Sequence, residues 1–300
     1  MSGFGWNFLS AMALQGSVLL SSIIVARLLG LVSFGAYSVL ITTVMTIATV
    51  AQGGTGLLAT KFVGEGLAND KVRVARVLRL CRAFTLVTGG LSAIGVFLLS
   101  QSLATGMLGR PELEPLVRII AVATFFQVSV SYQYGALQGF GVFKELSRGG
   151  VLAGIAYILF TVAGAWGWGL KGALIGFVLA SALRAGIFGL LLHQVRRSHN
   201  VPDSAKLDRT DLQMIWRFAL PTGLAGFITM PCLWLVTIIV ARQPDGLALV
   251  GILLVAHQVR LAVLQLPSLL NVVSFSVLSR LKGEGQVSSF RSVFWSNLCL

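Results

Sequence analysis

Charged side chains are scarce in this sequence. Asp, Glu, Lys and Arg make up 11% of its 300 residues, whereas soluble domains carry roughly 25%. Apolar stretches of about 20 residues, each long enough to cross a bilayer as a helix, recur from one end of the chain to the other. The low charge excludes an ordinary soluble domain, and the apolar stretches predict an all-α polytopic membrane protein.

Acidic residues are the scarcest charged type: there are only ten, all in loops or at the ends of predicted spans. A cation-expelling drug exporter needs a buried anion, and the predicted spans offer none. The three histidines lie in separate segments with no buried carboxylate beside them, so we predict no enzyme and no cofactor. Glu112 and Glu114 could form an acid–base pair on an external loop, but Arg110 and Arg118 flank them and favour a solvated turn.

Cysteines are also few, and the three are scattered without metal-ligand or disulfide spacing, which favours a packing role and predicts no metal site. Basic residues, in contrast, are plentiful, and the net charge is +13. They cluster in short loops between apolar stretches, which is the pattern of a membrane protein rather than of a nucleic-acid-binding domain. We therefore predict no nucleic-acid partner.

Charges and helix breakers divide the chain into eight predicted spans and the beginning of a ninth near residue 289. If the loops alternate between the two sides, 16 of the 23 basic residues fall on one side and 5 on the other. The positive-inside rule places the richer side, and with it the N-terminus, in the cytoplasm. The complete predicted spans are 4–29, 33–55, 76–105, 115–139, 149–169, 171–195, 213–241 and 247–279, and the predicted cytoplasmic loops are 56–75, 140–148, 196–212 and 280–288.

An internal repeat is indicated by short matches at a nearly constant offset. The segment IIVAR occurs at 23–27 and at 238–242, Gly35 matches Gly251, and GEG occurs at 64–66 and at 283–285. Six predicted spans separate the copies, so the repeat is parallel, with its pseudo-axis along the membrane normal. We expect a piece of a longer protein rather than a natural nine-span protein. The predicted parts are an N-lobe of six helices (1–195), a cytoplasmic linker (196–211) and the start of an incomplete C-lobe (212–300).

Four segments resemble the oligosaccharide (O-antigen-type) flippases of the multidrug/oligosaccharidyl-lipid/polysaccharide exporter superfamily. ARLLGLVSFGAYSVL (26–40) is similar to the junction between their first two spans, and GALQGFGVFKELSRGGVLAGI (135–155) to the turn between the fourth and fifth. RFALPTGLAGFI (217–228) is similar to the entry to their second lobe, and LPSLLNVVSFSVLSRL (266–281) to the end of the eighth span.

This resemblance implies a MATE-like bundle of two lobes around a cavity that opens alternately to each side. It also implies a multi-pass protein of the bacterial cytoplasmic membrane that flips an oligosaccharide linked to undecaprenyl pyrophosphate, among membrane lipids and with polysaccharide polymerase machinery as a candidate partner. A MATE-type cation-coupled multidrug exporter and a lipid II flippase remain alternatives. The second is less favoured, because related peptidoglycan-precursor flippases carry extra arginines in a first span that here is uncharged until Arg27. The sugar composition, the coupling ion and the oligomeric state stay open.

Polar residues at helical spacing mark the candidate substrate cavity, among them Gln127, Ser131, Tyr134 and Gln138 in the fourth predicted span and Asn7, Ser10, Ser17 and Ser21 in the first. Lipid cannot satisfy such groups, so they should face other helices or water, and hydrogen bonding between helices is the alternative to cavity lining. Arg184 and Arg260 lie inside predicted spans, where a charge costs roughly 2.5–3.5 kcal/mol on insertion scales, and would suit a diphosphate. The full candidate set is Arg260, Arg184, His257, Asn271, Gln127, Gln138 and Asn7.

Overall fold

The computed structural model describes residues 2–67, 70–202, 220–261 and 263–264. Throughout these ranges the secondary structure is helical, with no strand. The chain divides into a compact unit of residues 1–255 and a second unit of residues 256–300, and the helices below belong to the first unless stated. Four helices are long and apolar enough to cross a membrane, in agreement with the predicted all-α polytopic class.

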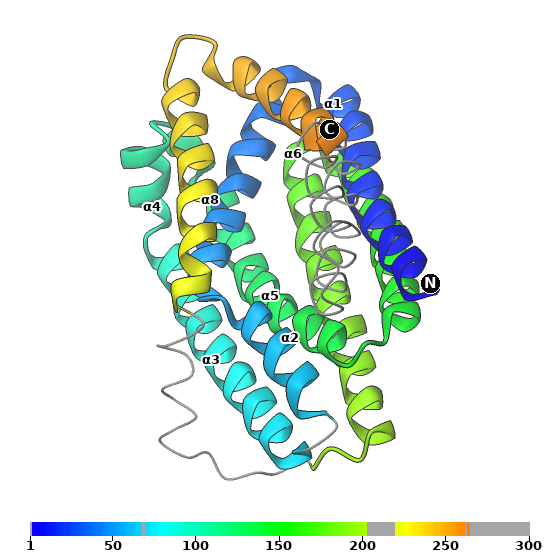
Figure 1. Cartoon of the computed structure of the whole chain (residues 1–300). Coiled ribbons are helices and arrows are strands. Elements are labelled where there is room, and N and C mark those ends of the chain that lie inside the picture. Colours follow the sequence, from blue (N-terminus) through cyan, green and yellow to red (C-terminus); the bar gives the residue numbers. More distant parts are fainter. Residues whose placement is uncertain (1, 68–69, 203–219, 262, 265–300) are drawn as a thin grey trace, which may run out of the picture. The chain divides into compact units, whose positions relative to one another are not determined.

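The first two predicted spans form α1 (Ser2–Ala51), which is broken at Gly30. Gly30 has φ 73° and ψ 166°, a conformation that residues with a Cβ rarely adopt. The break separates the two predicted spans at the position where sequence placed their junction. In Figure 1, α1 is the dark-blue and blue helix pair.

The predicted loop 56–75 is helical in most of its length, because α2 (Thr55–Gly66) occupies it, and its cytoplasmic side stays a prediction. Leu58 and Val63 are fully buried on one face of α2, whereas Lys61 and Glu65 on the other face are exposed. The charges that suggested a loop therefore belong to the solvent face of an amphipathic helix. The preceding predicted span ends at residue 51 rather than 55, because Gly53 and Gly54, both with positive φ, turn the chain from α1 into α2.

The next helix, α3 (Lys71–Leu98), begins at Asp70, whose side chain accepts a hydrogen bond from the Arg73 backbone N–H at 2.8 Å. Such an N-cap stabilises the first turn, so the span starts five residues before its predicted limit. Three short segments connect it to the next long helix, namely α4 (Ser100–Ser102), the π-helix η1 (Leu103–Met107) and the 3-10 helix η2 (Pro111–Leu113). Helix α5 (Glu114–Gly139) follows, within one residue of the prediction.

Helix α6 (Phe143–Ser198) holds the fifth and sixth predicted spans as two halves that meet at a break. The break lies at Trp168 and Gly169, and Gly169 has φ 58°. The halves fold back on each other closely, because a Cβ on Gly164 would lie 2.1 Å from the Gly172 carbonyl oxygen. With the break in α1, all six predicted spans of residues 1–195 are helical.

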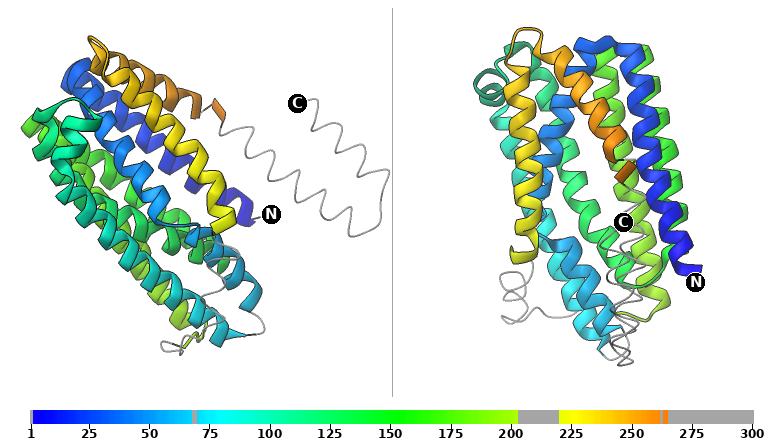
Figure 2. Two further views of the ribbon diagram at one scale, coloured as in Figure 1. Left: turned by 90° about the vertical axis from the view of Figure 1, so that its left-hand side faces the viewer. Right: turned by 45° about the horizontal axis from the view of Figure 1, so that its top comes forward.

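Two clusters of buried side chains hold the first unit together. One contains Leu40, Ile120 and Phe177 and joins α1, α5 and α6. The other contains Leu78 and Phe188 and joins α2, α3, α5 and α6. Helices α5 and α6 contribute to both clusters, so they form the centre of this unit, with α1 on one side and α3 on the other (Figure 2).

Two further helices, α8 (Leu220–Ala241) and Gly246–Leu261, cover the predicted seventh span and part of the eighth. Helix α8 packs against α1, where the indole N–H of Trp234 donates to Thr43 Oγ1 at 3.0 Å. The rest of the predicted linker and spans, at 203–219 and 265–300, lies outside the described residues. The predicted division into lobes therefore stays a prediction.

The two matched glycines of the internal repeat lie at the contact between α1 and Gly246–Leu261. A Cβ on Gly35 would lie 1.7 Å from the Leu247 carbonyl oxygen, and one on Gly251 would lie 2.9 Å from that of Leu31. Leu247 follows Leu31 by the same 216 positions that separate Gly251 from Gly35. Reciprocal contacts of this kind are those of a two-fold arrangement, so they support the repeat, and the parallel direction of its axis stays a prediction.

Candidate functional site

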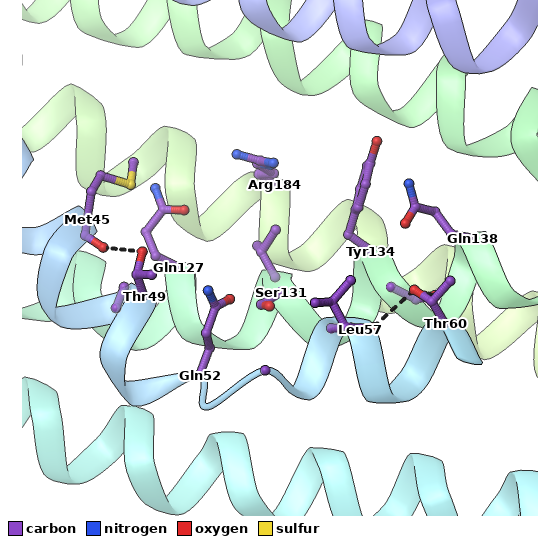
Figure 3. Close-up of a pocket in the computed structure, with 15 residues that line it drawn as sticks. Met45, Thr49, Gln52, Leu57, Thr60, Gln127, Ser131, Tyr134, Gln138 and Arg184 are labelled. Carbon is purple, nitrogen blue, oxygen red and sulfur yellow. Dashed lines mark hydrogen bonds between the residues drawn. The ribbon is translucent and has the colours of Figure 1, made fainter. Parts of the chain in front are cut away.

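A cavity of about 510 Å³ lies between the end of α1, the start of α2, one face of α5 and the second half of α6 (Figure 3). Its wall combines amide, hydroxyl and guanidinium groups with a few apolar side chains. The lining residues are Met45, Ala48, Thr49, Gln52, Gly54, Gly56, Leu57, Thr60, Gln127, Val130, Ser131, Tyr134, Gly135, Gln138 and Arg184.

The predicted polar stripe on α5 faces this cavity. Gln127, Ser131, Tyr134 and Gln138 all line it, as their helical spacing predicts. Gln127 also donates from Nε2 to the Ser181 hydroxyl at 3.2 Å, which fixes it against α6. The stripe thus supplies both the cavity wall and a hydrogen bond between helices.

The α2 side of the cavity was not found from sequence. Its position depends on close contact between glycines, because a Cβ on Gly135 would lie 2.1 Å from the Gly56 carbonyl oxygen. Thr60 adds a hydrogen bond from its hydroxyl to the Gly135 carbonyl at 2.9 Å. The available signal was the GG pair at 53–54, where both glycines have positive φ and turn the chain from α1 into α2. That turn brings Gln52 and Thr60 to the cavity.

Arg184 is the cation of the cavity. Its guanidinium carbon lies 5.7 Å from the centre of the Phe188 ring, and its Nε is buried without a hydrogen-bond partner among the described residues. In Figure 3 the side chains of Arg184, Gln127 and Tyr134 extend into the same space. Among the described residues that line the cavity there is no carboxylate to neutralise the guanidinium.

The structure therefore brings together three of the predicted site residues, Arg184, Gln127 and Gln138. Arg260 and His257 belong to the second unit, where Arg260 Nη2 lies 3.4 Å from His257 Nδ1 and Arg260 is exposed. For these two residues the cavity role stays a prediction. It also stays one for Asn271 and for the side chain of Asn7, both of which lie outside the described part of the chain.

Other sequence candidates have structural partners. Glu114 accepts a hydrogen bond from Arg118 at 2.6 Å, and Glu112 lies 3.6 Å from Arg110, so each carboxylate of the external turn is paired with an arginine. The two ion pairs support the solvated turn rather than an acid–base site. In α1, the buried Ser21 hydroxyl lies 2.7 Å from that of Thr161 on α6, which is a hydrogen bond between helices rather than a cavity group.

Comparison with known proteins gives the family of the chain. The polysaccharide biosynthesis protein family matches residues 1–282. The chain is 24% identical to the EPS I polysaccharide export inner membrane protein EpsE of Ralstonia nicotianae, over 91% of this chain and 62% of that protein. It is 26% identical to the succinoglycan biosynthesis transport protein ExoT of Rhizobium meliloti, over 75% of this chain and 43% of that one. The chain thus spans less than two thirds of the length of these relatives.

Solved structures of MATE transporters share the fold. An inward-facing multidrug resistance MATE family transporter of the MOP superfamily superposes with a TM-score of 0.80 at 20% identity, covering 94% of this chain and 66% of that one. A MATE protein in the straight conformation gives a TM-score of 0.72 at 20% identity, covering 96% and 66%. With the fold of the MATE transporters and the match over residues 1–282, the chain belongs to the polysaccharide biosynthesis protein family.

Proposed function

We propose that the protein flips oligosaccharide units linked to a polyprenyl pyrophosphate across the bacterial cytoplasmic membrane, for surface polysaccharide synthesis. The observation that carries this proposal is a polar membrane cavity with a guanidinium and, among the described residues of its wall, no carboxylate. Relatives named for polysaccharide export and succinoglycan transport support the same substrate class. The resemblance to the flippase superfamily implies alternating access, in which the cavity opens first to one side and then to the other.

The charge of Arg184 suits the head group of such a substrate. A diphosphate that leaves water needs compensating positive charge, and a guanidinium offers planar, bidentate donors that stay protonated. Its buried Nε already lacks a partner among the described residues. An anion in the cavity would accept a hydrogen bond from this Nε. One contact would then give Nε its partner and compensate the charge of the substrate.

The remaining polar groups suit the sugar. Gln52, Gln127 and Gln138 each carry an amide that both donates and accepts, and Thr49 adds a hydroxyl near them. Sugar hydroxyls need such groups in place of water. A row of amides also tolerates different sugar units, because each amide can serve a hydroxyl in either hydrogen-bonding role.

Two other transporter classes are less favoured. The similar solved structures include multidrug transporters, but at such low identity they support the fold alone. A cation exporter needs an anion near its substrate, and the described lining of this cavity supplies a cation instead. A lipid II flippase is less favoured because the sequence before Arg27 carries no arginine.

The test measures surface polysaccharide in a flippase-null strain that expresses variants of the protein. A charge-assisted contact contributes roughly 1.5–3 kcal/mol, so Arg184→Ala should lower the transport rate roughly ten- to a hundredfold. Arg184→Lys should retain part of the activity, because the charge survives and the bidentate geometry does not. Arg148→Ala is the matched control, since Arg148 is an exposed arginine on the same helix.

Membrane levels of each variant are compared by immunoblot. Normal polysaccharide in cells with well-expressed Arg184→Ala would show that the guanidinium is structural, and the anion-binding account would lose its main support. Arg260→Ala is measured in parallel, because its predicted role in the cavity is independent of Arg184.

A further inference from the structure

A second groove, of about 500 Å³, lies on the other side of α5 from the cavity already described. Its walls come from α3, α5 and the second half of α6, and it shares no lining residue with the first cavity. On α5 the two sites use opposite faces, with Ser131 and Tyr134 in the first and Ser129 and Gln133 in the second. The proposed transport cavity therefore leaves this groove unexplained.

One end of the groove is basic. Arg82 on α3 and both His193 and Arg196 on α6 line it, and its lining holds no carboxylate among the described residues. Arg196 also donates from Nη2 to the Pro202 carbonyl at 2.9 Å. Arg196 is two residues from the end of α6, so this end of the groove lies close to the helix ends that the basic asymmetry assigns to the cytoplasmic surface.

A buried amide faces the middle of the groove without a full set of partners. Gln133 is only 8% exposed, and its Oε1 has no hydrogen-bond partner among the described residues. Gly189 on α6 makes room for this amide, because a Cβ there would lie 3.2 Å from Gln133 Nε2. An unsatisfied amide oxygen in a groove that two arginines also line indicates a place for a ligand that offers both a donor and an anion.

The other end of the groove is apolar. Leu86 on α3 and Phe125 on α5 line it. Ala182 and Gly186 on α6 also line it and have no long side chains. Ala182 lies 14 residues before Arg196, which is about 21 Å along a helix. The groove therefore runs from a basic end near the membrane surface to an apolar end near the bilayer centre.

We propose that this groove binds an anionic glycerophospholipid of the surrounding membrane. Its phosphate would contact Arg82 and Arg196, a hydroxyl of its head group, as in phosphatidylglycerol, would donate to Gln133 Oε1, and an acyl chain would lie along Leu86 and Phe125. Basic pockets between helices near the cytoplasmic surface bind such head groups. A soluble anion would leave the apolar half of the groove unused, so the shape favours an amphiphile. The proposal does not depend on the transported substrate.

The experiment is native mass spectrometry of the purified protein in detergent, with dioleoyl phosphatidylglycerol or dioleoyl phosphatidylethanolamine added at equal concentration. We expect phosphatidylglycerol to bind roughly tenfold more tightly, because its net charge is −1 whereas the ammonium group of phosphatidylethanolamine offsets the phosphate charge near the two arginines. Arg82→Gln and Arg196→Gln should each remove most of that preference and weaken phosphatidylethanolamine binding less. Arg197→Gln is the matched control, because Arg197 is exposed and lies outside the groove.

A steric variant tests the same groove without removing charge. Gly189→Leu should displace the Gln133 amide and fill the space, and so lower binding of both lipids while the melting temperature of the protein is unchanged. Equal phosphatidylglycerol binding by the wild type, Arg82→Gln and Gly189→Leu would overturn the proposal. Displacement of bound phosphatidylglycerol by equimolar undecaprenyl phosphate would also overturn it, because the groove would then belong to the transported lipid.

Discussion

Gly35 offers the sharpest test of how the repeated halves meet. It lies in the second part of α1, after the break at Gly30, where its backbone touches the carbonyl oxygen of Leu247. The Cβ of an alanine at residue 35 would lie 1.7 Å from that oxygen. A relaxed contact between carbon and oxygen is about 3.3 Å, so Gly35→Ala requires the two backbones to separate by about 1.6 Å.

Two opposing terms set how much Gly35→Ala changes the stability of the protein. Alanine favours a helix over glycine by about 1 kcal/mol, whereas an overfilled site costs about 1–3 kcal/mol and occasionally more. At Gly35 the obstacle is backbone, which has no rotamer to change, so we expect Gly35→Ala to destabilise the protein by about 2 kcal/mol net. At Gly251 the nearest atom is the Leu31 carbonyl oxygen at 2.9 Å, and a shift of a few tenths of an ångström relieves it. For Gly251→Ala the helix gain and the steric cost should then nearly cancel.

Gly16 provides the control on the same helix, because a Cβ there meets nothing within 4 Å. Gly16→Ala should therefore leave the protein unchanged or raise its stability by up to about 1 kcal/mol. The assay is thermal unfolding of the purified variants in one detergent. The expected order of melting temperature is lowest for Gly35→Ala, intermediate for Gly251→Ala and highest for Gly16→Ala.

The double variant checks the geometry further. One separation of the helices relieves both contacts, so in the Gly35→Ala background Gly251→Ala should keep only its helix gain and raise stability by up to about 1 kcal/mol. A Gly35→Ala protein as stable as Gly16→Ala, or a double variant no more stable than Gly35→Ala alone, would refute the reciprocal contact between Gly35 and Leu247.

Two further predictions concern topology and packing. Single cysteines at Glu112 and Lys144, in a cysteine-free background, should be labelled from opposite sides of the membrane. The reason is that α5 between them has 26 residues and spans about 39 Å. Labelling of both cysteines from one side would contradict the topology. Thr43→Val removes the acceptor of the Trp234 indole N–H and should lower stability by about 1 kcal/mol. In the same unfolding assay Thr42→Val should lower stability less, since the Thr42 hydroxyl donates to the Ser38 carbonyl of its own helix. Equal losses of stability for the two variants would show that the hydrogen bond between Trp234 and Thr43 contributes nothing.

The long spans could be predicted from sequence because the signal is local. Lipid imposes a length and an apolar composition on each span, and the breaks at Gly30 and Gly169 fall where two predicted spans meet. The α5 stripe was predictable for a related reason. Its polar residues recur at helical spacing on one element, so their common face follows from the sequence of that element alone.

Features that depend on contacts between distant segments could not be predicted in the same way. Helix α2 was taken for a loop because Lys61 and Glu65 outweighed the buried Leu58 and Val63 in a short window. The groove at Gln133 combines residues from three helices, and no single helix shows it. The relative importance of Arg184 and Arg260 was also beyond sequence, since both are arginines inside predicted spans and only packing distinguishes their surroundings.

The polarity of α5 is the strongest argument for two separate ligand sites. A helix inside a membrane can carry polar groups on a face only where protein, water or a polar ligand meets them. On one face, Gln127 and Ser131 border the first cavity and Gln127 has a hydrogen bond to α6. On the other, Gln133 is buried and its Oε1 is unpaired among the described residues. Packing between helices accounts for the first face in part, whereas the Gln133 oxygen on the second face would gain a partner from a hydrogen-bond donor in the groove.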